Sequence, residues 1–531
     1  MIFNRLLLTI AVLSVTTGVS AQYQEPEKKV QPLNLLDSIG YKVEIQGSFS
    51  HGKTPLWLNA NKYGLSSLEN MNGYLRGAIE RPLSVDNGRK WGIGYGLDVA
   101  GAVNYTSKLV VQQAYVQARW LHGVLTVGAK EEPMELKNNS LSSGSQTLGR
   151  NARPVPQVRL ALPEYWKIPL TKGWLHMKGH IAYGKMTDDN WQHEFTNRQT
   201  KYADNVLYHS KAGYLKIGNE ERYFPLSVEL GLEMACTFGG TAYMYDAESG
   251  GLKPVKGGTG FKDFWKAFLP GGAEKVEEGT VYQNAEGNQL GSWVFRINYD
   301  ADWWRLSLYG DKYFEDHSSM LFLDYDGYGT GENWNVREKR RYFLYALKDY
   351  LLGIEFHKKY NSWLNTILFE YIYSKYQSGP IYHDHSEGRP DSHICGDDNF
   401  YNHYIYTGWQ HWGQVIGNPL YRSPIYNEDG TIEVKDNRFM AFHLGFDGQP
   451  SERFGYRGMV TYQEGVGTYQ HPYYKKHHNV SFLVEGKYNF ISRKKWLNGT
   501  SITAGYGMDF GAILGGINYG FQLTLAKSGI F

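Results

Sequence analysis

The chain has 531 residues, a formal net charge of +2 and a mean hydropathy of −0.48. The small net charge argues against a general nucleic-acid-binding protein, because no long basic face is needed to explain it. The 42 tyrosines, 61 glycines and 15 tryptophans are high numbers for a soluble enzyme. The hydropathy excludes a helical membrane bundle. It is compatible with a β-barrel, whose strands face lipid only at alternate positions and whose loops and lumen are wet.

The N-terminus has the features of a secretory signal peptide. Arg5 precedes an apolar run from Leu6 to Val15, and small residues at Val19 and Ala21 predict cleavage before Gln22. The apolar run is too short to cross a hydrocarbon core of about 30 Å. An exported chain without a helical membrane anchor is therefore expected.

The domain organisation follows from this start and from the absence of linkers farther along. We predict a signal peptide at 1–21, a polar periplasmic lead-in at 22–40 and a single outer-membrane β-barrel domain at 41–531. The two cysteines, Cys236 and Cys395, are too few for a disulfide framework, and a single bridge between them is the alternative to two unpaired thiols.

From Tyr41 onward the sequence alternates with period two, which places apolar side chains on one face of a strand. The clearest case is Pro225 to Phe238, where Leu, Val, Met, Cys and Phe occupy every second position. Glu229 and Glu233 lie on the opposite face, which favours water or a polar lumen over a dry core.

Eighteen segments have this strand character, and 157–162 is the weakest of them. An even number is what a closed antiparallel barrel with both termini on one side requires. The segments are 41–50, 73–82, 90–103, 109–120, 121–130, 157–162, 173–186, 208–218, 224–237, 292–299, 301–316, 340–357, 363–377, 437–447, 452–463, 477–490, 500–510 and 516–526.

The gaps between these segments sort by length if the last strand runs down into the periplasm. Short gaps then fall on the periplasmic side, among them 219–223, 300–301, 358–362 and 448–451. The long gaps fall outside, at 131–156, 187–207, 238–291, 317–339 and 378–436. Short turns on one side and long extracellular loops on the other are typical of outer-membrane barrels. A soluble secreted β protein such as a propeller is the alternative, but no repeated blade of about 40–50 residues is present.

The last segment, Gly516 to Phe531, alternates from Ile517 to Leu525 and ends on an aromatic residue. A C-terminal strand that ends on Phe resembles the assembly signal of bacterial outer-membrane barrels. This resemblance implies the barrel-assembly machinery as a partner. We also expect the segment to close the ring by pairing with Tyr41–Ser50.

The loop at 378–436 combines histidines and carboxylates with aromatic residues. His-x-His with nearby carboxylates could bind a divalent metal, but the spacing matches no zinc signature, and solvated loop histidines are the simpler interpretation. No nucleophile-elbow or comparable catalytic signal is present, so neither metal, cofactor nor enzyme activity is predicted. The residues concerned are His383, Asp384, His385, His393, Asp397, Asp398, His403, Trp409, His411, Trp412 and Tyr421.

Clustered Trp and Tyr among Asn, Asp, His and Arg are also typical of carbohydrate binding, because aromatic faces stack on sugar rings. Arg150, Arg153 and Arg159 in Ser142 to Leu160 suit anionic groups such as uronate or phosphate. They equally suit internal salt bridges to lumenal glutamates, and the aromatic residues equally suit packing of the loops over the barrel mouth.

Five strings resemble the capsule assembly protein Wzi family in the form found in Bacteroides-like bacteria. The resemblance implies an eighteen-stranded outer-membrane barrel that acts as a lectin for capsular polysaccharide and has no catalytic residues. The lead-in before Tyr41 is too short for the periplasmic helical bundle of the enterobacterial member. The strings are TPLWLNANKYG (54–64), NGYLRGAIE (72–80), SGSQTLGRNARPVPQVRL (143–160), HSKAGYLKIG (209–218) and NFYNHYIYTGWQHWGQVIGNPLYRSP (399–424).

The hypothesis is therefore a monomeric all-β outer-membrane barrel, surrounded by outer-membrane lipid, whose extracellular loops bind capsular or surface polysaccharide. The main alternative is a porin or solute channel, which would need an open lumen; the bulky loops 238–291 and 378–436 favour a plugged one. The candidate polysaccharide-binding residues are Arg150, Arg153, Asn402, His403, Trp409 and Trp412.

Overall fold

The computed structural model describes residues 34–219, 222–246, 248, 250–269, 287–315, 349–377 and 398–531, with short pieces at 327–328, 332, 337–338, 382–384 and 392–394. Two units separate, Met1–Leu35 and Leu36–Phe531. The predicted signal peptide and most of the lead-in lie outside the described residues. No helix among the described residues is long and apolar enough to cross a membrane.

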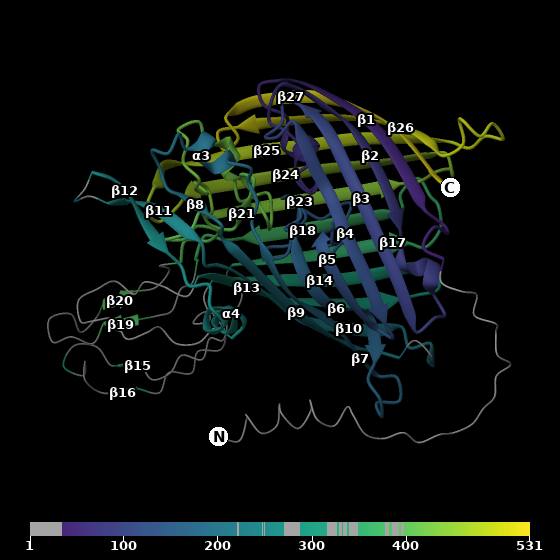
Figure 1. Cartoon of the computed structure of the whole chain (residues 1–531), viewed down its shortest axis with the longest axis horizontal. Coiled ribbons are helices and arrows are strands. Elements are labelled where there is room, and N and C mark those ends of the chain that lie inside the picture. The colour runs from purple at the N-terminus through teal and green to yellow at the C-terminus, as the bar shows by residue number, and fades with distance from the viewer. Residues whose placement is uncertain are drawn as a thin grey trace. The chain divides into compact units, whose positions relative to one another are not determined.

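Eighteen strands of the second unit form one closed antiparallel sheet (Figure 1). The strands are β1 (Gly40–His51), β2 (Met71–Arg81), β3 (Trp91–Val103), β4 (Leu109–Trp120), β5 (Gly123–Ala129), β6 (Gln157–Lys167), β7 (Leu175–Lys185), β9 (Leu207–Ile217), β10 (Leu226–Phe238), β13 (Asn288–Asp300), β14 (Trp304–Glu315), β17 (Tyr350–Lys358), β18 (Thr366–Tyr373), β23 (Phe439–Gly448), β24 (Phe454–Gly467), β25 (Pro472–Phe490), β26 (Thr500–Gly511) and β27 (Gly516–Ile530).

The predicted ring closure is confirmed, because β27 pairs with β1 from Tyr519↔His51 to Ile530↔Gly40. Closure satisfies every strand edge, as hydrocarbon requires, since each unpaired backbone group there costs several kcal/mol. Each of the eighteen predicted segments overlaps one strand, although residues 340–348 of the segment 340–357 lie outside the described residues. The weakest, 157–162, continues to Lys167 through a register shift between Leu162 and Trp166. β25 also begins five residues before its predicted start at 477, at Pro472.

The long and short connections between strands lie at opposite ends of the barrel, as predicted. One end of the barrel carries short turns such as 121–122, 301–303 and 449–453, while the other carries 130–156 and 374–438. The long-loop end also has three short connections, at 104–108, 468–471 and 512–515. Antiparallel strands with this asymmetry place the long loops outside the cell and the short turns in the periplasm.

The outer surface of the barrel is an apolar belt with aromatic residues at its margins. Outward-facing side chains such as Leu523, Leu525 and Val484 are exposed on the barrel surface. Near the periplasmic turns, Trp91 stacks on Trp120 with 5.9 Å between ring centroids. An apolar band with aromatic girdles is the lipid-facing surface of an outer-membrane barrel, and the protein is one.

Smaller elements lie in the long loops. The three-stranded sheet β12-β11-β8 stands at the extracellular end, and the two-stranded pairs are β15-β16, β19-β20 and β21-β22. The helices and small strands are α2 (Leu56–Asn59), η1 (Leu83–Asp86), α3 (Trp191–Phe195), β8 (Tyr202–Asp204), β11 (Thr241–Asp246), β12 (Gly251–Lys256), α4 (Phe261–Phe268), β15 (Gly327–Tyr328), β16 (Arg337–Glu338), β19 (Tyr382–Asp384), β20 (Ser392–Ile394), β21 (Gln410–His411), β22 (Gln414–Val415) and η5 (Pro424–Tyr426).

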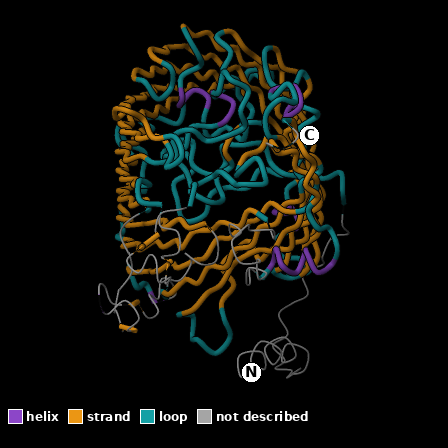
Figure 2. Tube along the Cα trace, turned by 90° about the vertical axis from the view of Figure 1, so that its left-hand side faces the viewer, coloured by secondary structure: helices purple, strands orange, loops and turns teal. Residues whose placement is uncertain are grey.

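Loop segments fill the space that the strands enclose. Figure 2 shows them crossing the interior of the ring. They come chiefly from 52–70, 130–156 and 398–437, whose buried apolar side chains form the largest core cluster. We call these three segments the plug. The described residues of loop 378–436 lie in the lumen, which agrees with the expectation of a plugged barrel, whereas 239–269 contributes the extracellular sheet and α4.

Candidate functional site

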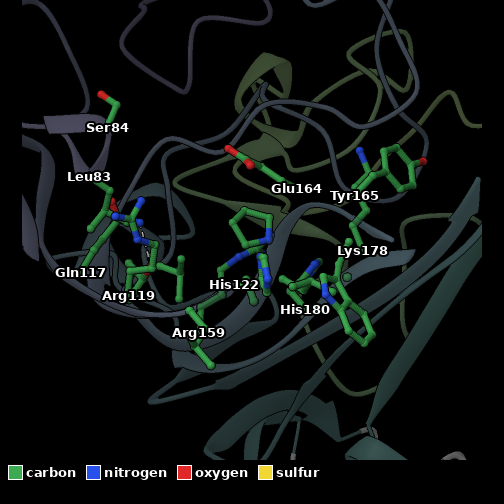
Figure 3. A pocket seen from close by; sticks show the side chains of 18 of the residues that line it. Leu83, Ser84, Gln117, Arg119, His122, Arg159, Glu164, Tyr165, Lys178 and His180 are labelled. Carbon is green, nitrogen blue, oxygen red and sulfur yellow. Dashed lines mark hydrogen bonds between the residues drawn. The ribbon is translucent and has the colours of Figure 1, made fainter. Parts of the chain in front are cut away.

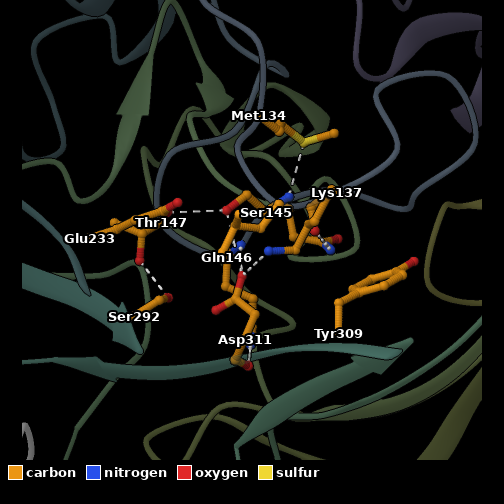
Figure 4. A network of polar contacts seen from close by, with 12 residues as sticks. Met134, Lys137, Ser145, Gln146, Thr147, Glu233, Ser292, Tyr309 and Asp311 are labelled. Carbon is orange, nitrogen blue, oxygen red and sulfur yellow. Dashed lines mark hydrogen bonds and ion pairs between the residues drawn. The ribbon is translucent and has the colours of Figure 1, made fainter. Parts of the chain in front are cut away.

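Acidic side chains of the barrel wall hold the plug in place (Figure 4). Asp311 of β14 accepts hydrogen bonds at Oδ2 from Lys137 Nζ (2.8 Å) and from the Gln146 backbone N–H (2.9 Å). Beside it, Thr147 Oγ1 lies 2.7 Å from Ser292 Oγ of β13. Charge-assisted bonds of this kind are about twice as strong as neutral ones, so this row fixes the segment 130–156 to the wall.

Two further wall carboxylates repeat this arrangement. Glu370 of β18 accepts from Ser142 Oγ (2.6 Å) and from the Ser143 backbone N–H (2.8 Å). Glu315 at the end of β14 accepts from the Tyr401 backbone N–H (2.5 Å). The polar inner face predicted from Glu229 and Glu233 is therefore confirmed, and part of it binds loops rather than water.

The centre of the plug is densely packed. Tyr401 and Tyr421 lie 4.1 Å apart between ring centroids, and both are fully buried. Trp409 has an exposed fraction of 0% and donates its indole N–H to Thr147 O at 2.9 Å. Interiors packed in this way leave little room for solutes, so the middle of the lumen is closed.

Among the predicted polysaccharide-binding residues, Trp409 and Asn402 lie inside this packing. Asn402 makes paired hydrogen bonds with Val434, donating to its carbonyl at 2.9 Å and accepting from its N–H at 2.8 Å. His403 accepts at Nδ1 from the backbone N–H groups of Ile405 and Tyr406, both at 3.1 Å. Burial lowers the pKa of His403 to about 3, so its ring is neutral at pH 7. These contacts stabilise the loop.

Arg153 and Trp412 come together where the plug meets the extracellular loops. The Arg153 guanidinium lies 4.0 Å from the centroid of the partly exposed Trp412 ring and donates to Thr106 Oγ1 at 2.7 Å. Burial lowers the pKa of Arg153 to about 10, which leaves it charged at pH 7. Arg150 lies apart from them, 5.7 Å from the centroid of the Tyr63 ring. The structure therefore joins two of the six predicted residues in one cation–π pair.

His411 connects this pair to the neighbouring loop. Its Nδ1 lies 2.8 Å from Arg153 O, and its Nε2 accepts the Thr187 backbone N–H at 3.1 Å. An outer pocket of about 30 Å³ adjoins it, lined partly by Asp188, Gln192 and Trp412. This volume holds about one water molecule, so a glycan here would bind across the rim of the pocket.

A larger cavity opens toward the periplasmic turns, between the plug and the wall formed by β4 to β9 (Figure 3). Its volume is about 800 Å³, and an adjacent space of about 90 Å³ shares part of its lining and is also lined by Arg153. Sequence analysis missed it, although the inward-facing positions of the strand patterns contain most of its polar lining. Those residues include Gln117, Arg119, Lys130, Arg159, Lys178 and His180.

No group of three or more His, Cys, Asp or Glu side chains among the described residues is placed to hold a metal ion. The side chains of His383, His385, His393 and Asp397 lie outside the described residues, as does Cys395. Cys236 is buried near the C-terminal end of β10.

Comparisons with known proteins place the fold. No protein-family model and no curated protein sequence matches the chain. The structure is similar to Wzi, an outer-membrane protein of Escherichia coli described as a carbohydrate-binding β-barrel involved in group 1 capsule assembly. The TM-score is 0.51 at 11% identity, over 91% of this chain and 83% of Wzi. OprD of Pseudomonas aeruginosa aligns with a TM-score of 0.43 at 8% identity, over 93% of this chain and 95% of OprD. The likeness to Wzi supports a common barrel fold.

Proposed function

We propose that this outer-membrane barrel binds capsular or other surface polysaccharide at its extracellular face and helps to hold it on the cell. The observation that carries the proposal is the plug. Loops that would otherwise extend outward fill the lumen and hide Tyr401, Trp409 and Tyr421 from solvent. A barrel closed in this way leaves its extracellular mouth, rather than an open lumen, for contact with surface polymers.

The mouth has the chemistry that a polysaccharide needs. Trp412 offers part of an indole face for stacking on a sugar ring, and the buried Arg153 guanidinium holds that ring in place through the cation–π contact. Tyr404 and Tyr245 add phenol groups that are 65% and 69% exposed. Each contact is weak, but a repeating polymer can engage several at once, which raises the overall affinity.

The fold adds independent support, since Wzi is described as a carbohydrate-binding barrel involved in capsule assembly. The family resemblance of the sequence strings points in the same direction. In this proposal the buried candidates Trp409, Asn402 and Arg153 act as supports for the mouth, while the partly exposed Trp412 contacts the glycan.

Polysaccharide retention tests the proposal. Purified protein in detergent should retain capsular polysaccharide from its host, and Trp412→Ala and Arg153→Gln should each weaken retention severalfold. Trp363→Ala is the matched control, because Trp363 is 73% exposed but lies in a periplasmic turn. Retention no better than that of an unrelated barrel would refute the proposal.

A solute channel is the second candidate, and the cavity of about 800 Å³ favours it. Arg153 lines the smaller space next to this cavity, and it contacts His411 and Trp412, which line the outer pocket. Planar-bilayer recording distinguishes the two candidates. The polysaccharide-binding proposal expects no large stable current from the intact protein, whereas a channel would give one.

A further inference from the structure

The lipid-facing side of the barrel carries a row of cations at its extracellular end. Lys375 follows β18, Arg438 precedes β23, and Lys476 lies on β25. The strands β18, β23, β24 and β25 are consecutive neighbours around the ring (Figure 1). Strand register aligns them: Tyr373 pairs with Met440, Met440 with Glu464 and Glu464 with His478, and each cation lies two residues beyond one of these partners. We call Lys375, Arg438, Glu464, Lys476 and His478 the lip cluster.

The side chains of the lip cluster point outward. In a strand, residues two apart share a face. On β24, Glu464 shares its face with Val460 and Tyr462, whereas the neighbouring Thr461 and Gln463 are buried toward the lumen. Arg438 shares its face with Met440 and Phe442 in the same way. The cluster therefore belongs to the outer surface of the barrel, unlike Arg150 and Arg153.

Its height corresponds to the outer edge of the membrane. Strands rise about 3.4 Å per residue and tilt by about 40°, so each residue adds about 2.6 Å along the membrane normal. The outward-facing residues of β24 from Phe454 to Tyr462 then span about 21 Å, close to the apolar band of about 25 Å of such barrels. Glu464 is the next outward position, at the level of the lipid headgroups.

Contacts hold the cations in place. Glu464 forms ion pairs with Lys375 and with Lys476, the latter at 3.1 Å. The Arg438 guanidinium lies 3.5 Å from the Tyr469 ring centroid, and its Nε donates to Lys375 O at 3.0 Å. His478 Nδ1 lies 2.8 Å from the Tyr462 hydroxyl. Two of the three cations thus pair with the one carboxylate while Arg438 does not, and the cluster keeps a net positive charge.

We propose that the lip cluster binds the phosphate groups of the phosphorylated glycolipid that forms the outer leaflet of the outer membrane, that is, of lipopolysaccharide. Basic residues beside a membrane attract anionic headgroups. Arg438 can present its guanidinium to phosphate oxygens in a bidentate fashion. The apolar face below, with Phe442, Tyr462 and Val460, continues into the belt and lies where acyl chains of the same molecule would pack. The positive charge of the cluster and its position directly above the apolar belt therefore favour a phosphate that is carried by a lipid.

Lipid A supplies the test. Full-length protein in detergent would be titrated with lipid A carrying its phosphates and with dephosphorylated lipid A, and the bound lipid counted by native mass spectrometry. We expect the phosphorylated form to bind at least fivefold more tightly. Lys375→Gln combined with Arg438→Gln and Lys476→Gln should remove that preference. Equal binding of the two lipids to the unaltered protein would overturn the proposal.

Two controls keep the result interpretable. Arg493→Gln with Lys494→Gln removes cations from the periplasmic turn 491–499 and should leave the preference intact. Replacing Lys375 and Lys476 by Arg instead of Gln should preserve the preference for phosphorylated lipid A. For every variant, the difference in gel migration between heated and unheated samples shows whether the barrel is folded. Loss of preference in the periplasmic variant, or displacement of lipid A by an equal concentration of inorganic phosphate, would show that no lipid site exists here. Polysaccharide retention is measured separately, since the lip cluster does not include Arg153 or Trp412.

Discussion

Lys137 of the plug and Asp311 of the wall form an ion pair from which solvent is almost entirely excluded. Their Nζ and Oδ2 atoms are 2.8 Å apart, and the two side chains have exposed fractions of 1% and 0%. Removing one partner leaves an uncompensated buried charge, which costs far more than an exposed ion pair contributes. This pair is therefore a main attachment of the plug.

Breaking the pair should loosen the plug. We expect Lys137→Met to destabilise the attachment by about 3–5 kcal/mol, because Asp311 would lose its cation in a dry environment. Hydrogen exchange of the backbone amides in 130–156 measures the effect. The double variant Lys137→Met with Asp311→Leu should recover part of the loss, because it removes both charges. If the double variant exchanges as fast as the single one, the ion pair is not the attachment.

Trp409 and Trp412 should respond differently to the same substitution. Trp409→Ala removes a fully buried indole from the plug core and should cost about 3–5 kcal/mol, seen as faster exchange of the plug amides. Trp412→Ala removes a partly exposed ring and a cation–π contact of about 0.5–2 kcal/mol, and should mainly reduce polysaccharide retention. The reverse outcome, with Trp409 controlling retention at unchanged exchange, would place the glycan inside the plug.

These two tryptophans show where sequence reasoning succeeds and where it ends. All eighteen strands could be predicted, because alternation with period two follows from strand geometry and an apolar belt. The surroundings of Trp409 and Trp412 could not, although they are only three residues apart. Aromatic residues among amides and histidines form the same pattern in a packed plug as in a sugar-binding surface. Only the contacts with distant segments, such as Thr147 on Trp409 and Arg153 on Trp412, separate the two.

The cavity lining illustrates the same limit. The inward positions of Arg119 and Arg159 follow from alternation on β4 and β6. The two side chains line one cavity because segment 130–156 does not cover this part of the barrel wall. The position of that segment cannot be predicted from the local strand pattern.

Acid should weaken the plug through His411. Burial lowers the pKa of His411 to about 4, below its ordinary value of 6.5. The unfolded segment therefore takes up a proton as pH falls below about 6.5, while the folded plug remains unprotonated until about pH 4. Stability is lost across this window, by about 3 kcal/mol at its lower end.

The comparison of wild type with His411→Gln isolates this effect. Asp436 opposes it, because burial raises the pKa of Asp436 to about 7 and its protonated form favours the folded plug at low pH. Plug stability is measured by hydrogen exchange, corrected for the intrinsic rate at each pH. The stability of the wild-type plug relative to that of the His411→Gln plug should therefore fall as the pH is lowered from 6.5 to 4. A difference that is constant over this range would show that His411 is not a titrating group of the plug.

Phe531 should matter more for assembly than for stability. Its ring lies 4.8 Å from the Tyr41 ring and its N–H donates to Ile39 O at 2.9 Å, beyond the last paired residues of β1 and β27. Losing one aromatic contact costs about 0.5–1.5 kcal/mol, too little to open a ring closed by twelve residue pairs. Phe531→Ala should thus refold normally into detergent but reach the outer membrane in severalfold lower amounts. Ile530→Ala, equally exposed at the same end, is the control. A matching loss in refolding and in membrane assembly would assign Phe531 a structural role instead.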